Sequence, residues 1–248
     1  MKLNLSNITL LGVDCVNVER LQAAMNVCQK DIEFGAVKFL TSLPTNDKRL
    51  VKISHIGSVE EYSKFCVSDL KDYVDTDFVL IVQYDGFILN SESWTDEFLK
   101  YDYIGAPWLV ADWSIRDFNF PKSLLGTMVV GNGGFCLRSR KFLEVSAKLM
   151  SEGKIPQVHP EDVSLCIWHK DLLDKEGIKI APPDLASIFS IEGDDQIYEK
   201  QFGFHGFSWT DIDKWVDEHS EYYIIVDGYK NARAAHFARQ LERQKSKN

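Results

Sequence analysis

Two short segments of the sequence carry side chains that can hold a divalent cation. Gln83-Tyr84-Asp85-Gly86 follows a strongly apolar run, and a carboxylate placed there can project into a cleft and ligate Mg²⁺ or Mn²⁺. His205 stands between glycines and phenylalanines in FGFHGF (202–207), where a neutral imidazole can also serve as a ligand. Both segments fit structural roles as well, because Asp85 can cap the next turn and His205 can be a hydrogen-bonded, half-buried side chain.

A pair of acidic residues can supply a general base. Glu161 and Asp162 follow His159-Pro160 and precede a predicted helix. Acids in a first helical turn often do no more than offset the helix dipole. Because they come after a proline-containing loop, however, one of them can face a cleft and take a proton from a hydroxyl group.

A glycine-rich segment, Gly131-Asn132-Gly133-Gly134, lies between these two groups of residues. Three glycines in four residues allow the backbone to approach a ligand closely. The spacing is neither the GxGxxG of a dinucleotide-binding turn nor a phosphate-binding P-loop. A tight hairpin or a bulge remains the structural alternative.

The elements that must position these residues alternate in the first third of the chain. Apolar runs predict strands at 8–14, 36–42, 49–56 and 77–85, and helical spacing predicts helices at 17–30 and 58–74. This alternation predicts an α/β fold with a mainly parallel central sheet flanked by helices. Ligands bind beyond the carboxyl ends of such strands, which is where Asp14 and Asp85 fall.

The rest of the chain is less regular. We expect an aromatic, loop-rich segment at 95–115, and within 128–150 a strand, the glycine turn and then a helix from about Ser139. We also expect a helix over 161–177 closed by Gly177, and short strands around a Pro-Pro turn within 179–192. The segment from Lys230 is basic and helical. We therefore place one domain at 1–229, followed by a basic tail at 230–248.

Composition excludes several classes of protein. The 248 residues are 45% hydrophobic and 26% charged, which argues against disorder, and the net charge of −9 argues against a protein that coats nucleic acid. No apolar run approaches the ~20 residues of a membrane helix. The five cysteines form no CxxC pair, so we expect small buried side chains in a reducing cytoplasm rather than a disulfide framework or a zinc site.

Taken in order, these motifs resemble the GT-A superfamily of nucleotide-sugar glycosyltransferases. Finer features resemble one GT-A-like family of unknown-function domains. The resemblance covers about residues 8–207, and it is carried by the stretches TDFVLIVQYDGFILN (76–90), WTDEFL (94–99), YDYIGAPW (101–108), GNGGFCLRSRKFL (131–143) and HPEDV (159–163).

The resemblance implies an inverting transferase with a divalent metal, Mn²⁺ or Mg²⁺, held by Asp85 and His205. Asp162 would be the general base, with Glu161 as an alternate or an acceptor ligand. This sequence departs from the usual DxD motif at Gln83, where an amide replaces the first acidic side chain. Metal binding can therefore be weak or absent, and Gln83 can instead bind ribose or phosphate.

The resemblance also implies a nucleotide-binding half at about 1–90 and an acceptor half at about 91–229 of the domain. It further implies contacts with the donor, which we expect to be a UDP-sugar. Asp14 would lie near the base or ribose. Arg138 would pair with phosphate, unless it is a structural ion-pair partner. Trp108 would offer an aromatic face to a sugar ring, unless it is a core residue. The backbone at Gly133 and Gly134 would approach the donor sugar or the acceptor.

The sequence does not identify the acceptor. A hydroxyl on a glycan, a protein, a small metabolite or a modified DNA base all fit, and the last corresponds to a viral-type hydroxymethylpyrimidine glycosyltransferase. Two other classes remain: a non-catalytic nucleotide-sugar or glycan-binding module whose metal motif has decayed, and a nucleotidyltransferase, which also uses strand-end acids with a divalent metal.

Overall fold

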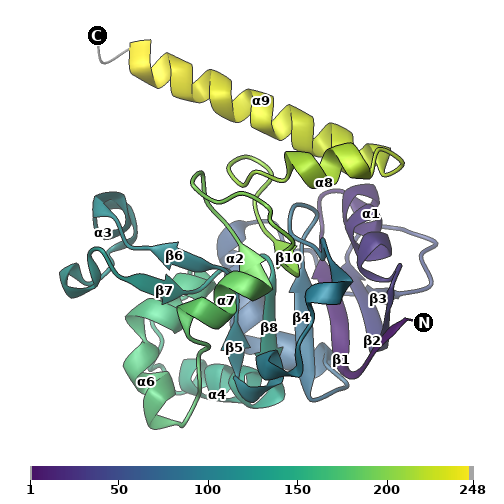
Figure 1. Cartoon of the computed structure of the whole chain (residues 1–248). Helices are drawn as coiled ribbons and strands as arrows, with labels where there is room; N and C mark the ends of the chain where they lie inside the picture. Colours follow the sequence, from purple (N-terminus) through teal and green to yellow (C-terminus); the bar gives the residue numbers. More distant parts are fainter. Residues whose placement is uncertain (1, 246–248) are drawn as a thin grey trace.

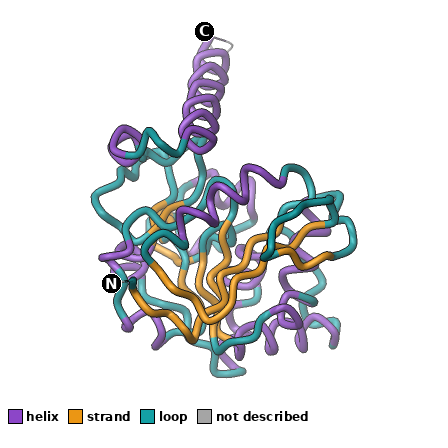
Figure 2. Tube along the Cα trace, turned by 90° about the vertical axis from the view of Figure 1, so that its right-hand side faces the viewer, coloured by secondary structure: helices purple, strands orange, loops and turns teal. Residues whose placement is uncertain are grey.

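A six-stranded sheet forms the centre of this computed structural model, which describes residues 2–245 (Figures 1 and 2). Five of the strands share one direction, and only the strand at 136–139 runs antiparallel to its neighbours. The expected α/β fold, with a mixed and mainly parallel sheet, is thereby confirmed. Across the sheet, the strands are β3 (Leu50–Lys52), β2 (Ile32–Thr41), β1 (Leu3–Val13), β4 (Phe78–Val82), β8 (Cys136–Ser139) and β5 (Tyr103–Ile104).

Helices cover both faces of this sheet. The chain passes from β1 through α1 (Val18–Cys28) to β2 on one side, and later through α2 (Val59–Ser68) to β4 on the other side of β1. Because such crossovers are right-handed, this reversal puts α1 and α2 on opposite faces. The carboxyl ends of β1 and β4 therefore flank a topological switch point, the place where open α/β sheets bind ligands.

The caps of these two helices follow the sequence. The side chain of Asn17 accepts hydrogen bonds from the backbone N–H groups of Glu19 and Arg20, and Ser58 accepts one from Glu61. A side-chain oxygen at this position satisfies amides that have no partner within the helix. The Glu61 carboxylate turns back to the N–H of Gly57 rather than to that of Ser58.

The middle of the chain is more ordered than its aromatic composition suggested. Residues 95–115 contain a 3-10 helix (Asp96–Lys100), β5, β6 (Pro107–Leu109) and the start of α3 (Asp112–Phe118). After the glycine turn, β8 precedes α4 (Arg140–Ser151), and Ser139 caps this helix at the start that the sequence predicted.

Two predictions for the third quarter of the chain need correction. The helix expected at 161–177 is divided into α5 (Glu161–Val163), a π-helical turn (Ser164–Trp168) and α6 (Lys170–Lys175), although it is closed by Gly177 at φ +72° as expected. The short strands expected in this segment are found in part, because Ile180 bridges Tyr103 before the prolines and β9 (Ser190–Ile191) follows them. The prolines do not form a turn: Pro183 begins α7 (Pro183–Phe189), since proline is well suited to the first helical turn.

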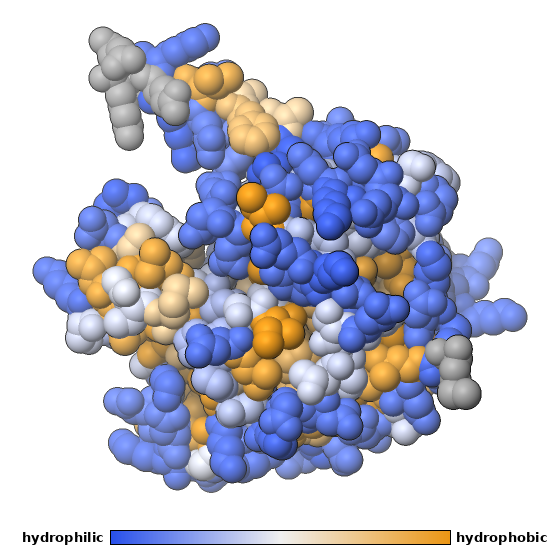
Figure 3. Space-filling model, viewed as in Figure 1, coloured by the Kyte–Doolittle hydropathy of each residue, from blue (hydrophilic) through white to orange (hydrophobic). Residues whose placement is uncertain are grey.

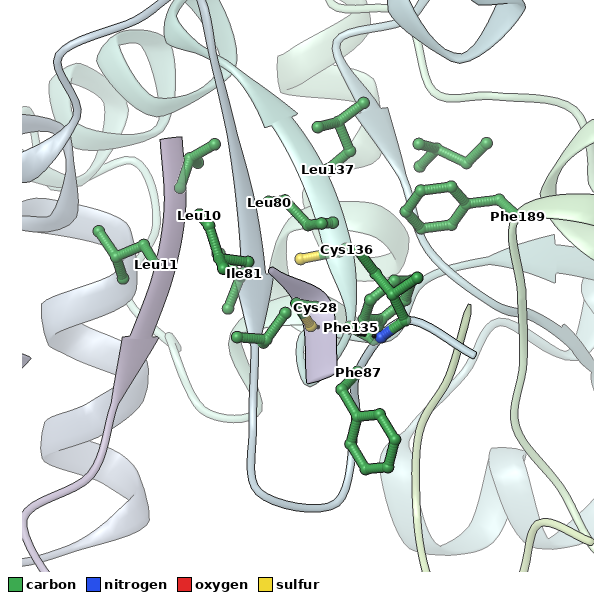
Figure 4. Packing of buried hydrophobic residues seen from close by; sticks show 14 of the residues in the cluster. Leu10, Leu11, Cys28, Leu80, Ile81, Phe87, Phe135, Cys136, Leu137 and Phe189 are labelled. Atoms are coloured by element: carbon green, nitrogen blue, oxygen red, sulfur yellow. Dashed lines mark hydrogen bonds between the residues drawn. The ribbon is translucent and has the colours of Figure 1, made fainter. Parts of the chain in front are cut away.

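The hydrophobic core lies against the centre of the sheet. Leu10, Leu80 and Leu137 are in register across β1, β4 and β8, and each is at most 1% exposed. Figure 4 shows them beside Phe135 and Phe189, whose rings stack at 5.1 Å. All five cysteines are buried, as expected.

Two parts project from this body (Figure 1). The arm, residues 107–130, consists of β6, α3 and β7 (Met128–Val130). The long C-terminal helix α9 (Tyr223–Lys245) is buried at its start and projects beyond Tyr229.

Within residues 2–245, no helix is long and apolar enough to cross a membrane. Lys247, part of the expected basic tail, lies outside the described residues. The remaining elements are 3-10 helices at Leu70–Tyr73, Ser91–Ser93 and Lys122–Leu124, β10 (Gly203–Phe204) and α8 (Asp213–Glu218).

Candidate active site

A tight turn after β4 holds the first two site residues. Gln83 and Gly86 exchange backbone hydrogen bonds at 2.9 and 3.2 Å, so the turn presents Gln83 and Asp85 beyond the strand end. The Asp85 Oδ1 atom is buried and has no hydrogen-bond partner. Burial raises the pKa of Asp85, although the nearby His205 partly opposes this. A buried, unpartnered carboxylate oxygen is unusual and suits a site that binds a cation.

His205 reaches this turn from the end of β10. Its Nε2 atom lies 3.3 Å from Gln83 Oε1 and 3.7 Å from Asp85 Oδ1, and its Nδ1 atom donates to Glu192 Oε1 at 2.7 Å. Burial by itself lowers the pKa of the imidazole, but the charges of Glu192 and Asp85 raise it to about 9. The structure therefore brings together Gln83, Asp85 and His205, which are distant in sequence.

Glu192 is a site residue that the sequence reasoning missed. Its carboxylate accepts from His205 Nδ1 and, through Oε2, from Trp108 Nε1 at 2.6 Å. A signal was present, because Glu192 follows the short strand β9 and precedes a glycine, just as Asp85 follows β4 and precedes Gly86. The strand has only two residues, however, and the short strands expected within 179–192 were not given exact bounds.

The acidic pair at the start of α5 divides between two environments. Asp162 Oδ2 accepts from the N–H of Gly133 and Oδ1 from that of Val163, both at 2.8 Å. Burial raises the pKa of Asp162 to about 7, and the charges of Glu161 and Glu192 add to the effect. Glu161 instead turns inward. It is 5% exposed, pairs with Arg138 Nη2 at 3.1 Å and accepts from the Ser63 hydroxyl at 3.3 Å.

Arg138 and Asp14 are both engaged with protein partners. Arg138 is fully buried, and besides its ion pair with Glu161 its guanidinium lies 5.5 Å from the centre of the Tyr103 ring. This is the structural alternative named for Arg138. The Asp14 carboxylate lies at the end of β1, where it pairs with Arg20 at 2.6 Å, and the Arg20 guanidinium in turn covers the Tyr84 ring at 3.9 Å.

The glycine segment allows close approach, but by protein side chains. A Cβ atom on Gly133 would lie 2.1 Å from Glu161 Oε1, and one on Gly134 would lie 2.1 Å from His205 Nε2. Real Cβ atoms do not come this close to other atoms, so any other residue would displace these neighbours. The absence of side chains at Gly133 and Gly134 thus allows the acidic pair and His205 to pack against the same loop.

A cavity of about 570 Å³ opens beside Asp162. We call it the aromatic cavity. Its volume lies within the range of small-molecule binding sites. Indole groups and carboxylates dominate its lining, and none of the described residues that line it is a lysine or arginine. The indoles belong to Trp108, Trp113 and Trp209, and the carboxylates to Asp162, Glu192, Asp194 and Asp195.

The groups around Asp85 fit a divalent cation only in part. The unpartnered Asp85 oxygen, the His205 imidazole and the Gln83 amide oxygen face one another, and Glu192 holds His205 through Nδ1, so that Nε2 would be the ligating atom once a cation displaces its proton. Among residues 2–245, however, no three His, Cys, Asp or Glu side chains gather in a metal-binding arrangement. The chain thus offers one carboxylate, one imidazole and one amide, and a ligand or water must complete the shell.

Comparison with known proteins gives one sequence match and several matches of fold. A family model described as "Protein of unknown function (DUF5672)" matches residues 47–205. No curated protein matches the sequence.

Similar solved structures include the glycosyltransferase GlyE of Streptococcus pneumoniae, which is 15% identical with a TM-score of 0.47 over 89% of this chain and 63% of that one. A mannosyltransferase of Pyrobaculum calidifontis, solved with GDP-Man and Mn²⁺, is 13% identical with a TM-score of 0.41 over 72% and 55%. The bifunctional IspDF of Campylobacter jejuni is 13% identical with a TM-score of 0.42 over 71% and 48%. The chain thus spans between about half and two thirds of the length of these proteins.

Proposed function

The chain belongs to the family described as Protein of unknown function (DUF5672), and we propose that it is a glycosyltransferase that moves a sugar from a nucleotide-sugar donor to a hydroxyl acceptor. One observation carries the proposal: Asp162, a carboxylate whose pKa is raised to about 7, is fixed by two backbone N–H groups in a cavity lined by three indoles. A base with a pKa near neutrality is matched to accepting a proton at physiological pH.

Asp162 takes the acceptor proton in this proposal. As the acceptor oxygen forms a bond to the anomeric carbon, the bond from that carbon to the diphosphate oxygen breaks and the nucleoside diphosphate leaves with the electron pair. The hydroxyl proton passes to Asp162. Attack opposite the leaving group inverts the anomeric centre, as in inverting glycosidases, where a carboxylate activates the nucleophile. Glu161 is unsuited to this step, because its carboxylate is directed toward Arg138 and Ser63.

The donor diphosphate belongs near the turn after β4. Asp85 Oδ1, His205 Nε2 and Gln83 Oε1 converge there, at the switch point between β1 and β4. These groups would hold Mn²⁺ or Mg²⁺, which when bound offsets the negative charge that develops on the departing diphosphate. The nucleotide would extend toward the end of β1, and by resemblance we propose uridine as its base.

The acceptor belongs in the aromatic cavity. Indole faces pack against the apolar faces of rings, and Trp108 is fixed for this by its hydrogen bond to Glu192. Four carboxylates and no described lysine or arginine line the cavity, so a phosphate group would be repelled there. This lining favours an uncharged or cationic acceptor over a base within DNA.

A thermal-shift screen of nucleotide sugars, with and without Mn²⁺, tests the proposal. A ligand at about 100 times its Kd stabilises a protein by roughly 2.7 kcal/mol, which is readily measured. We expect one nucleotide sugar to raise the melting temperature in a Mn²⁺-dependent way and to release nucleoside diphosphate on incubation. Release of pyrophosphate would instead identify a nucleotidyltransferase. Donor binding without sugar transfer to any of the acceptors tested would indicate a non-catalytic binding module.

A further inference from the structure

The arm carries a cluster of exposed apolar side chains. Leu109, Trp113, Leu125 and Met128 are 49%, 51%, 50% and 43% exposed, and we call them the arm patch. Leu109 and Met128 are register partners across β6 and β7, so these two side chains belong to one surface. Figure 3 shows apolar residues gathered on the left, where the arm projects. Clustered exposed apolar side chains on a water-soluble body usually mark an interaction surface.

The outer part of α9 combines apolar and basic residues. Phe237 and Leu241, one helical turn apart, are 48% and 58% exposed. The whole helix has five basic residues against two acidic ones, although the chain as a whole has a net charge of −9. Of the basic residues, Arg233 is tied to Asp211 at 3.8 Å. Positive charge is therefore concentrated on an element that projects from an acidic molecule.

The arm and the helix meet at the aromatic cavity. Leu109 and Trp113 of the arm patch and His236 of α9 all line it, and His236 bonds Asp194 at 3.2 Å on the same rim. In the view of Figure 1, the arm and the free end of α9 project toward the same side of the molecule. A surface that contacted both would lie across the mouth of the cavity.

We propose that the arm patch and the outer part of α9 dock together on an anionic lipid bilayer. Tryptophan and leucine are favoured at the boundary between headgroups and acyl chains. Each lysine or arginine near an anionic surface contributes about 1 kcal/mol of attraction, and the acidic body is repelled, which orients the molecule with α9 toward the lipid. The docking places the cavity mouth at the membrane surface and does not depend on the reaction proposed above.

The charge favours lipid over a second copy of the chain as the occupant. In a two-fold contact the same surface of both copies meets, which would bring two basic helices to one interface. An anionic bilayer instead supplies acyl chains for the apolar side chains and negative headgroups for the basic ones. One partner can therefore bind the arm patch and the outer part of α9 together.

Vesicle co-sedimentation of the full chain tests the apolar part of this contact. We expect binding to vesicles of equal parts phosphatidylcholine and phosphatidylglycerol, and Leu125→Ser should lower the partition coefficient about tenfold. Val59→Ser is the matched control, because Val59 is 61% exposed and belongs to α2 rather than to the arm or to α9. Equal losses for the two variants, or no binding by the unmodified chain, would overturn the proposal.

A second experiment tests the charge. Arg239→Glu should weaken binding to the anionic vesicles roughly tenfold, whereas Lys64→Glu on α2 should change it little. Added salt should release the protein from anionic vesicles because the attraction is screened. Equal binding to pure phosphatidylcholine and to anionic vesicles would contradict the assignment. So would a lipid-free dimer that Leu125→Ser dissociates, since the patch would then belong to a second copy.

Discussion

At the scale of single residues, Asp162 and Glu161 show how neighbouring carboxylates acquire different properties. Glu161 faces a buried arginine and is held as an ion pair. Asp162 receives only neutral backbone N–H groups, and it lies near other carboxylates. The charged form of Asp162 is therefore less favoured, and its carboxylate can take up a proton near pH 7.

Replacing Asp162 by Asn should abolish transfer while leaving donor binding in place. The amide oxygen can still accept from Gly133, so the loop should persist, but no group remains to take the acceptor proton. We expect kcat/KM to fall roughly 10²- to 10⁴-fold. Product release and donor titration on the same preparation give the two quantities. Loss of donor affinity in this variant would remove Asp162 from the role of base.

The raised pKa of Asp162 also predicts the pH dependence of activity. The base must be deprotonated to act, so kcat/KM should rise with pH and level off above about 7. A pH profile measured under subsaturating donor and acceptor reports this. A profile that falls through neutral pH would indicate instead that an acid is required.

The same carboxyl group should make folding stability depend on pH. Between the ordinary aspartate value of 3.8 and about 7, the folded protein keeps a proton that the unfolded chain has released. The free energy of unfolding should therefore fall as pH rises through this window. Urea titrations of the unmodified chain and of Asp162→Asn isolate the effect. The free energy of unfolding of the unmodified chain should fall relative to that of the variant as pH rises through this window, and the difference between the two should be constant outside it. A constant difference would mean that Asp162 ionises normally.

Asp85 should show a conflict between stability and function. Burial raises the pKa of its carboxyl group, so the ionised form destabilises the fold at neutral pH. Asp85→Asn should therefore raise the melting temperature of the free protein and abolish the effect of Mn²⁺ on donor binding. Thermal shifts with and without Mn²⁺ measure both. An unchanged Mn²⁺ response would remove Asp85 from the metal site.

At the scale of elements, the glycine segment determines how closely the two halves of the site can approach. Gly134→Ala would place a methyl group 2.1 Å from His205 Nε2, and the histidine or the loop would have to move. We expect a loss of about 1–3 kcal/mol in unfolding free energy, as for overpacking, together with weaker donor binding. Gly57→Ala is the control, because its Cβ would meet nothing closer than 3.5 Å. Similar urea midpoints for both variants would contradict the close packing.

The sequence was most informative about elements where local pattern and burial agree. The apolar run that became β4 and the caps at Asn17 and Ser58 follow from side-chain chemistry alone. The strand β8 is only four residues long, and its pairing with β4 and β5 comes from distant chain segments. For α7, the local helix-starting preference of Pro183 was the better guide than the turn we expected.

The site followed the same rule. Asp85 and His205 were proposed because each stands beside a glycine, and Asp162 because it follows a proline-containing loop and precedes a helix. The hydrogen bond between Trp108 and Glu192 could not be predicted, since these two residues are 84 positions apart and only the fold joins them. Arg138 was ambiguous for the same reason, because its burial beside Glu161 depends on tertiary packing.

At the scale of the whole molecule, α9 joins the folded body to its projecting end within one helix. Ile225, Val226 and Tyr229 are buried in the core, and the Tyr229 hydroxyl donates to Asp213 at 2.7 Å. Beyond them the side chains are exposed or only partly covered, and none of residues 238–243 is buried. The helix keeps contact with the body through Arg233, which pairs with Asp211, and through His236, which bonds Asp194, so it does not leave the body at the boundary proposed at 229–230.

Removing residues 238–248 should leave the fold intact, because the deletion spares both Tyr229 and the His236–Asp194 contact. We expect the free energy of unfolding to change by less than about 0.5 kcal/mol. Tyr229→Ala should instead lower it by about 3 kcal/mol, since a fully buried aromatic ring is lost. Urea denaturation compares the two. A truncated chain as unstable as Tyr229→Ala would show that the outer helix is part of the folded body, whereas a stable truncated chain that no longer sediments with anionic vesicles would separate folding from membrane contact.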